Sequence, residues 1–248
     1  MESLKTFLVE TPFVRAVGRG VVHGSSRIIK FGFTFNIREE TDDRWIIKDV
    51  VAHDCYRIKD RDLKGAIVID GGANFGTFSV FASHLVEDSG RVVAVEPYPS
   101  SFNLLVRNIS ANSCNNVKPV NVALSNSKGT RELMIYERTG ANSFFVVSDP
   151  SIRQKAKRKL TVRTSTIDAV TEDLRLDRVD LIKLDLEGAE LEALNGAEKV
   201  ISDHHPQITG ELHPSVYSID EVKKFLENRG YHFKNENSFF GMPMFWAS

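Results

Sequence analysis

A short apolar run that leads straight into glycines is the feature that most constrains the fold of this chain. Residues 66–70 (AIVID) show no polar alternation, which is typical of a β-strand buried on both faces. Gly71, Gly72 and Gly76 follow, and apolar residues then recur at helical spacing over residues 75–86. A strand, a glycine turn and a helix in this order predict the first unit of a parallel sheet covered by helices.

The same alternation continues along the chain. Further strands are predicted in the Phe-rich tail and at residues 91–96, 116–124, 160–164, 179–185 and 207–212. Helices are predicted at residues 102–109, 167–174, 188–200 and 219–228, and a pair of antiparallel strands at 131–136 and 143–147. The chain is therefore expected to be an α/β protein with a mostly parallel sheet, in which ligands bind at the carboxyl ends of the strands.

Two regions are expected, an N-terminal accessory or lid region at residues 1–60 and a main domain at residues 61–248. Apolar spacing over residues 4–17 favours a helix docked on the main domain over a membrane-surface segment, because its polar face is not strongly basic. The other elements expected in the first region are a strand or hairpin at residues 27–38 and a short helix at 42–53, capped by Thr41 or Asp42.

Charge and cysteine content narrow the class of protein. The 248 residues include 32 Lys and Arg against 33 Asp and Glu, so whole-protein attraction to nucleic acid or acidic lipid is not expected. A basic run at residues 153–159 is interpreted as a solvated loop or helix face rather than a polyanion site. Cys55 and Cys114 form no C-x-x-C pair, and no apolar stretch reaches the ~20 residues that span a bilayer. With no signal-peptide pattern at the N-terminus, a cytoplasmic protein is expected.

The glycine loop is the first candidate site. Gly72 and Gly76 flank Asn74 between a strand and a helix, where glycine lets the backbone approach a ligand and the helix start offers free N–H groups. The spacing is not the G-x-G-x-x-G of dinucleotide sites. A pyrophosphate would also lie poorly beside Asp70, whereas the ammonium group of a cofactor's amino-acid end would suit that carboxylate.

Two further candidates follow the next strands. Glu96 ends the second strand, and a carboxylate there can accept both hydroxyls of a ribose before Pro97 turns the chain. At the end of the third strand, the Asn121 amide could accept from an adenine amino group and the backbone N–H of Val122 could meet a ring nitrogen. A plain turn is an equally good interpretation of Asn121 and Val122.

The strand at 179–185 ends in a group of charged residues. Alternation places Lys183 and Asp185 on one side of the sheet, with Asp185 over the ligand crevice. Glu187, just before the next helix, is interpreted as a carboxylate that complements the helix dipole.

Glu211 and His213 follow the next strand and share a face by a period of two. A histidine titrates near neutral pH and can take a proton from a hydroxyl, although a purely structural pair is an equal alternative. Asp185, Glu211 and His213 could also assemble a divalent metal site. No ligand spacing demands one, so none is assigned.

Four segments together resemble the FkbM-type methyltransferases: residues 68–79, 95–97, 121–125 and, above all, 182–190 (IKLDLEGAE). Residues 43–48 with Tyr56 also look like the lead-in segment of that family. The 182–190 motif is distinctive, whereas the glycine loop alone is shared by many methyltransferases.

The resemblance implies a Rossmann-like, class I methyltransferase sheet of seven strands, the last antiparallel. It implies S-adenosylmethionine (SAM) as methyl donor and usually a hydroxyl acceptor on a sugar, polyketide or other small molecule. Carried onto this chain, Glu96 with Pro97 would hold the ribose and Asn121 with Val122 the adenine. The acceptor pocket would be covered by residues 1–60 and 129–148. The methionine part would lie against the glycine loop, formed by Asp70, Gly72, Asn74, Phe75 and Gly76.

These residues lead to a mechanistic hypothesis. His213, oriented by Glu211, would remove the acceptor proton, and Asp185 would position the acceptor or the cofactor. Three rivals stay open: a nucleotide-dependent oxidoreductase, a methyltransferase that acts on RNA through residues 153–159, and a cofactor-binding protein without catalysis. The sequence does not identify the acceptor or the oligomeric state.

Overall fold

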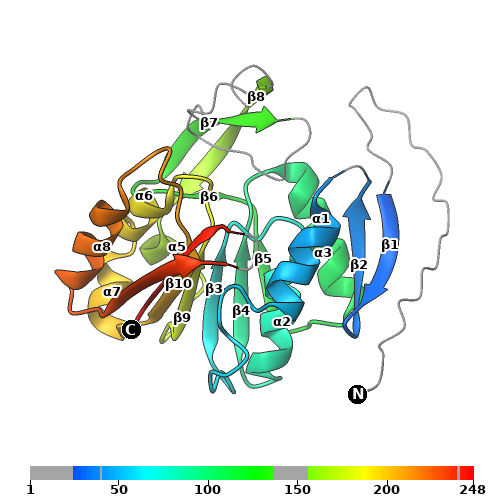
Figure 1. The fold of residues 1–248 in the computed structure, drawn as a ribbon, viewed down its shortest axis with the longest axis horizontal. Coiled ribbons are helices and arrows are strands. Elements are labelled where there is room, and N and C mark those ends of the chain that lie inside the picture. The colour runs from blue at the N-terminus through cyan, green and yellow to red at the C-terminus, as the bar shows by residue number, and fades with distance from the viewer. Residues whose placement is uncertain (1–24, 40, 137–155, 239–240) are drawn as a thin grey trace.

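A seven-stranded sheet forms the centre of the molecule in the computed structural model, which describes residues 25–39, 41–136, 156–238 and 241–248 (Figure 1). Its order is β11-β12-β10-β9-β3-β4-β5, and β12 runs antiparallel to both of its neighbours. The expected sheet, with its last strand antiparallel, is confirmed. Its strands are β3 (Ile67–Gly71), β4 (Arg91–Val95), β5 (Val117–Val120), β9 (Leu181–Leu184), β10 (Gln207–Glu211), β11 (Phe233–Asn237) and β12 (Pro243–Ala247).

Helices cover both faces of this sheet. Neighbouring residues of β3 point to opposite sides, so Val68 joins the hydrophobic cluster beneath α2 and α3, and Ile69 joins the cluster beneath the helices of the second half. This double burial explains the unbroken apolar strands. The segment expected as one helix at 188–200 is two helices that separate at Gly196. The helices are α2 (Thr77–Val86), α3 (Pro99–Ala111), α5 (Ile167–Asp173), α6 (Glu190–Asn195), α7 (Glu198–His204) and α8 (Ile219–Glu227).

The described part of the N-terminal region is a hairpin followed by a short helical segment. The expected hairpin is confirmed as β1 (Ser25–Lys30) and β2 (Phe33–Arg38), and the expected helix as α1 (Asp43–Ile47) continued by the π-helical turn η1 (Lys48–Ala52). Of the two predicted caps, Asp42 makes no side-chain cap bond, whereas Thr41 Oγ1 accepts the N–H of Asp43, the first residue of α1, at 3.4 Å. The hairpin contacts α3 through the Asn36 N–H, which donates to Asn108 Oδ1 at 2.6 Å. The helix predicted at residues 4–17 lies outside the described residues.

A small second sheet, β6-β8-β7, begins directly after β5 in the chain and is separate from the large sheet. It contains β6 (Ala123–Leu124), β7 (Gly129–Tyr136) and β8 (Ala156–Ser165). The single strand predicted at 116–124 is therefore wrong. The main chain leaves the large sheet at Asn121, whose side-chain amide donates to the carbonyls of Glu96 at 2.7 Å and Pro97 at 3.2 Å.

The strand predicted at 131–136 is confirmed as part of β7, and its partner among the described residues is β8. β7 pairs antiparallel with β8, while the strand predicted at 143–147 lies outside the described residues. The basic run at 153–159 is not a loop or helix in its second half, because β8 begins at Ala156. Lys159 is exposed there, with its Nζ 2.7 Å from Glu132 Oε2 on β7.

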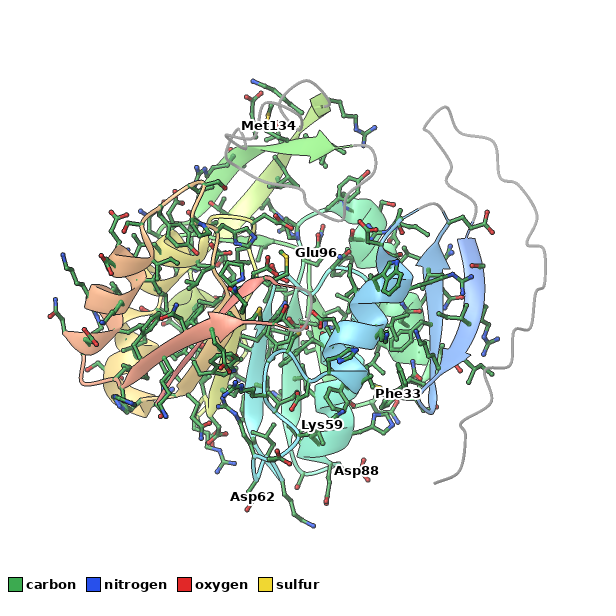
Figure 2. The ribbon with its side chains drawn as sticks, in the orientation of Figure 1. Phe33, Lys59, Asp62, Asp88, Glu96 and Met134 are labelled. Atoms are coloured by element: carbon green, nitrogen blue, oxygen red, sulfur yellow. The ribbon has the colours of Figure 1, made fainter. Side chains whose placement is uncertain are left out.

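The arrangement defines the two ends of the sheet. Figure 2 places Glu96 at the end that faces the small sheet, on which Met134 lies, and places Lys59, Asp62 and Asp88 at the opposite end. Among the described residues, none of the helices combines the length and the apolar character needed to cross a membrane.

Candidate active site

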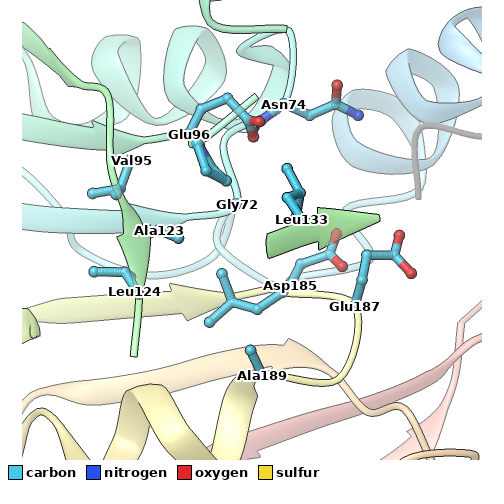
Figure 3. Close-up of a pocket in the computed structure, with 12 residues that line it drawn as sticks. Gly72, Asn74, Val95, Glu96, Ala123, Leu124, Leu133, Asp185, Glu187 and Ala189 are labelled. Carbon is cyan, nitrogen blue, oxygen red and sulfur yellow. Dashed lines mark hydrogen bonds between the residues drawn. The ribbon is translucent and has the colours of Figure 1, made fainter. Parts of the chain in front are cut away.

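A pocket opens at the carboxyl ends of β3, β4 and β9, the position expected for a ligand in this fold (Figure 3). Leu133 belongs to β7, so the small sheet supplies part of the pocket wall. The pocket is lined by Gly72, Asn74, Val95, Glu96, Pro97, Ala123, Leu124, Leu133, Asp185, Leu186, Glu187 and Ala189.

The glycine loop has a backbone that side chains would obstruct. Gly72 has a φ of 74°, and a Cβ there would lie 1.9 Å from the carbonyl oxygen of Asp185. Gly76 has a φ of 92° at the start of α2, and a Cβ there would lie 2.6 Å from Leu105 Cδ1. Glycine is required at both positions because it alone tolerates positive φ and such close approach without strain. The backbone of Gly72 therefore forms the floor of the pocket.

Glu96 faces this loop and is 7% exposed. Its Oε2 accepts the N–H of Asn74 at 2.9 Å, and its Oε1 accepts the N–H of Tyr98 at 2.8 Å. Burial raises the pKa of Glu96 to about 7, although the two N–H donors and the nearby Arg38 oppose the rise. The pocket thus presents a carboxylate that is fixed by main-chain groups and titrates near neutrality.

Asp70 does not line the pocket. It is fully buried, and its register partner Lys183 on β9 places Nζ 3.1 Å from Oδ1, while Ser79 Oγ donates to Oδ2. The same ammonium group donates to the carbonyls of Gly71 at 3.2 Å and Gly72 at 3.0 Å. Burial would lower the pKa of Lys183, but Asp70 and Asp185 outweigh it and hold the pKa above its ordinary value. The ammonium partner that the sequence pattern assigned to a ligand is thus present within the protein.

Besides Asp70, four residues predicted to hold the cofactor lie outside the pocket lining, namely Phe75, Gly76, Asn121 and Val122. Phe75 is fully buried, with its ring centroid 6.3 Å from that of Phe35. Asn121 holds the main chain of Glu96 and Pro97, and Val122 packs half-buried against the second hydrophobic cluster. Their contacts with a cofactor stay predictions.

Asp185, Glu211 and His213 come together beside the pocket, at and just after the carboxyl ends of β9 and β10. One potential ligand atom from each lies within 4.8 Å of the other two. His213 Nε2 is 3.6 Å from Glu211 Oε1, which agrees with the predicted shared face. Asp185 Oδ2 accepts the Tyr56 hydroxyl at 2.9 Å and is 3.9 Å from Lys183 Nζ, which agrees with the predicted common side. Their catalytic roles stay predictions.

Carboxylates surround the imidazole of His213. Nδ1 is 2.9 Å from Glu190 Oε1, and Nε2 is 3.4 Å from Glu187 Oε2. Burial would lower the pKa of His213, but Glu187 and Glu190 outweigh it and raise the pKa to about 12. Burial, and then the charge of Asp185, raise the pKa of Glu211 well above its usual range. In this arrangement the imidazole holds its proton and Glu211 favours the protonated form.

The helix-start role predicted for Glu187 is wrong. Glu190 is instead a carboxylate of the first turn of α6, and its Oε1 also accepts N–H groups of the preceding loop, from Leu186 at 2.7 Å and Gly188 at 3.3 Å. Glu187 has a φ of 53°, and its side chain lines the pocket. The two glutamates exchange roles because the positive φ turns the chain between the strand and the helix, which periodicity cannot reveal.

The sequence model of the family described as "Methyltransferase FkbM domain" matches residues 70–233. The chain belongs to the FkbM methyltransferase domain family. The match covers the glycine loop, Glu96 and the Asp185–Glu211–His213 group, but it leaves out the hairpin and β12.

Three relatives of this FkbM-family chain are informative. Methyltransferase sdnD of Sordaria araneosa is 26% identical and aligns over 76% of this chain and 82% of its own length. Hexuronic acid methyltransferase AglP of Haloferax volcanii is 25% identical, over 76% and 74% of the two chains. The 31-O-demethyl-FK506 methyltransferase FkbM of Streptomyces tacrolimicus is 24% identical, over 76% and 81%.

Solved structures show the same fold. Methyltransferase FkbM from Methylobacillus flagellatus KT has a TM-score of 0.53 at 20% identity, and the match covers 77% of this chain but 46% of that one. Aeropyrum pernix fibrillarin, solved with bound S-adenosyl-L-methionine, has a TM-score of 0.51 at 13% identity, with 93% and 85% covered. These likenesses confirm the Rossmann-like, class I methyltransferase fold.

Sequence reasoning missed two residues of this FkbM-family site. Arg38 on β2 donates to Asn74 Oδ1 at 2.9 Å and is paired with Asp43 at 2.7 Å, so the hairpin contacts the glycine loop. No local pattern marks Arg38, because the contact joins distant parts of the chain. Tyr56 lay within the family-like lead-in segment, but only the structure shows that it bonds to Asp185.

Proposed function

We propose that this protein is a SAM-dependent methyltransferase that methylates a hydroxyl group of a small molecule or sugar. The observation that carries the proposal is the pocket in which the main chain of Gly72 faces the buried carboxylate of Glu96. Membership of the FkbM family supports methyl transfer, and the fibrillarin complex is a fold relative with the donor bound.

The residues present fit this donor. Gly72 lines the pocket without a side chain, so its backbone is open to a ligand there, while the Asp185 carbonyl oxygen occupies the position that a Cβ would take. Each oxygen of Glu96 already accepts one N–H and has a second lone pair, so the pair can accept two ribose hydroxyls. Val95, Ala123 and Leu124 offer an apolar wall for a flat base. When bound, SAM supplies a methyl group activated on a sulfonium sulfur.

Asp70 has an indirect role in this proposal. Its pairing with Lys183 holds the ammonium group against the carbonyls of Gly71 and Gly72. The buried pair therefore fixes the shape of the glycine loop, and the loop contacts the methionine part of the donor.

The acceptor lies on the side of Asp185, Glu211 and His213 in this proposal. Asp185, held by Tyr56, orients the hydroxyl towards the methyl carbon. The C–O bond forms as the C–S bond breaks, its electron pair stays on sulfur, and the hydroxyl proton passes to the Glu211–His213 pair. An imidazole that holds its proton cannot accept another, so the proton passes to Glu211 in its ionised form, which the positive charge of His213 favours.

The acceptor class is supported by relatives. The printed names include a hexuronic acid methyltransferase and a 31-O-demethyl-FK506 methyltransferase, which point to hydroxyls of sugars and of polyketide-like small molecules. We propose the same broad class here.

Calorimetry with SAM and with NAD tests the donor. We expect one SAM per chain and no binding of NAD, and a protein that binds NAD but not SAM would contradict the proposal. Replacing Glu96 by Ala removes two charged hydrogen bonds and is expected to weaken SAM binding by about tenfold to 100-fold. Unchanged affinity would remove Glu96 from the ribose site.

Mass spectrometry with deuteromethyl-SAM tests the acceptor, with uronic acid glycosides and hydroxylated macrolides as the panel. We expect transfer of one labelled methyl group to oxygen in at least one class. Glu211→Gln is expected to lower kcat by about 100-fold or more on that acceptor. His213→Ala tests the alternative base. If the kcat lost in this variant, relative to wild type, depends on pH as the titration of a single imidazole does, the base is His213 and not Glu211. Binding of SAM without transfer across the panel would favour the non-catalytic rival.

A further inference from the structure

We propose that Asp185, Glu211 and His213 bind one divalent cation of the Mn²⁺ class at the edge of the pocket. The site lies where β9 and β10 end side by side, so two adjacent parallel strands supply all three ligands. The presence of this cation site does not depend on the proposed function. Its catalytic role rests on that function.

The separations of the ligand atoms fit a metal ion. One atom from each residue lies within 4.8 Å of the other two, and Nε2 of His213 is 3.6 Å from Glu211 Oε1. Ligands that each lie about 2.1–2.2 Å from an octahedral cation are separated by about 3.0 Å when adjacent and about 4.3 Å when opposite. The three side chains therefore need only small rotations to close around one ion.

The orientation of His213 is an independent observation. Its Nδ1 lies at an ion-pair distance of 2.9 Å from Oε1 of the fully buried Glu190. In the present orientation neither Nδ1 nor Glu190 Oε2 makes a hydrogen bond among the described residues. Metal-ligating histidines commonly donate one ring N–H to a buried carboxylate, which leaves the other nitrogen free for the metal. Here Nε2 is the nitrogen that faces Glu187 and Glu211, at 3.4 and 3.6 Å.

The charge around His213 also favours a cation. Four carboxylates surround this single imidazole, namely those of Asp185, Glu187, Glu190 and Glu211. Lys183, 3.9 Å from Asp185, is already paired with Asp70 at 3.1 Å. Of these carboxylates Glu190 is fully buried and the other three are partly exposed, and such a group of like charges is unfavourable unless a cation compensates it.

The ligand set and the pocket indicate the kind of ion and its use. Two carboxylates with one imidazole suit Mn²⁺, with Mg²⁺ as the harder alternative, whereas soft sulfur ligands are absent from this group of three. Asp185 lines the pocket, so further coordination positions face the ligand space. A hydroxyl bound there loses its proton more readily, and the proton passes to a neighbouring carboxylate as the C–O bond forms and the C–S bond breaks.

Electron paramagnetic resonance tests the site on the full chain after treatment with a chelating resin. Added Mn²⁺ should lose its free-ion signal up to one equivalent per chain, and echo modulation from one imidazole nitrogen should appear in the bound spectrum. Asp185→Asn, Glu211→Gln and His213→Gln should each weaken binding at least tenfold, and Glu190→Gln by about tenfold to 100-fold. Asp203→Asn, on the surface of α7, is the matched control and should leave binding unchanged.

The outcomes separate this proposal from the proposed function. Two results with the wild-type protein would overturn the site: no binding of Mn²⁺, or binding of Mn²⁺ without a nitrogen coupling. Neither result depends on whether a variant folds. Stoichiometric uptake of Zn²⁺ without Mn²⁺ binding overturns the cation class. If the metal-free protein binds SAM but no Mn²⁺, the proposed function stands and the metal site is overturned. If it binds Mn²⁺ but not SAM, the metal site stands and the proposed function is overturned.

Discussion

The two sides of the pocket are built in different ways. On the donor side, which we define as Gly72, Asn74 and Glu96, the polar groups are held by main-chain N–H donors and a backbone that only glycine permits. On the acceptor side, defined as Asp185, Glu211 and His213, ionisable side chains lie close to one another with few neutral partners. The donor side is complete without a ligand, whereas the acceptor side has unbalanced charge.

The two sides therefore get their shape from different parts of the structure. The donor side is preorganised by the turn between β3 and α2, so its shape does not depend on a bound ligand. The acceptor side depends on charges that a substrate, a proton or a cation can change. Lys183 lies between the two, since it contacts the carbonyl of Gly72 at 3.0 Å and lies 3.9 Å from Asp185.

Replacing Lys183 by Met should give the largest effect and should affect both sides of the pocket, because both sides share this residue. The change leaves Asp70 buried without its ammonium partner, which destabilises a protein by about 3–5 kcal/mol. Urea unfolding measures the loss in the free energy of unfolding. Lys118→Met, at an exposed position of β5, is the control, and an equal loss in both variants would contradict the role of the buried pair.

Replacing Gly72 by Ala should affect the donor side next most strongly. The new Cβ would lie 1.9 Å from the Asp185 carbonyl oxygen at a φ of 74°, so the loop must move, at a cost of about 2–4 kcal/mol in unfolding free energy. We also expect SAM affinity to fall at least tenfold by calorimetry. Gly129→Ala serves as control, because the nearest atom to its Cβ is 3.7 Å away. Retained SAM affinity in Gly72→Ala would show that the loop tolerates displacement.

The pH dependence of SAM binding tests the donor side alone, through the titration of Glu96. The pKa of Glu96 is raised from 4.5 to about 7, and ribose hydroxyls donate to the ionised form, so affinity should fall about tenfold between pH 8 and pH 6. The stability of the ligand-free protein should change in the opposite direction. The folded carboxyl keeps its proton to higher pH than the unfolded one, so its contribution falls as the pH rises from 4.5 to about 7.

Glu96→Gln should remove both effects, which calorimetry and thermal unfolding across this pH range would measure. A tenfold change that persists in Glu96→Gln would assign the titration to another group.

Tyr56→Phe should have the smallest effect and act on the acceptor side alone. It removes the hydroxyl that donates to Asp185 Oδ2 at 2.9 Å but keeps the ring packed on Phe78. A loss of about 1 kcal/mol in transition-state stabilisation would lower kcat about fivefold and leave the SAM dissociation constant unchanged. Tyr231→Phe is the matched control, because that buried hydroxyl has no hydrogen-bond partner among the described residues. Equal kcat for wild type and Tyr56→Phe would mean that Asp185 needs no support.

The donor side was largely predictable from the sequence because it depends on local order. A buried strand, glycines and a carboxylate after the next strand place Gly72 and Glu96 at the same sheet edge whatever else the chain does. Period-two alternation likewise predicted that Lys183 would lie beside Asp185. The sheet and its helices follow from the same periodicities.

The remaining features depend on tertiary contacts that no local pattern contains. Asp70 is engaged by Lys183 because their strands are adjacent, and Glu190 replaces Glu187 because the chain turns through a positive φ. Arg38 reaches Asn74 from a hairpin that precedes the region matched by the family. Side-chain chemistry could be predicted for these residues, but their partners could not.

The place of β12 in the sheet has a consequence for the order of folding. This strand lies between β10 and β11, although it follows both in the chain. β11 has no other neighbour in the described sheet, so it cannot dock before β12 has paired with β10. We therefore expect Glu211, whose register partner on β12 is Met244, to gain its final surroundings late in folding, after the local β3–α2–β4 unit that shapes the donor side.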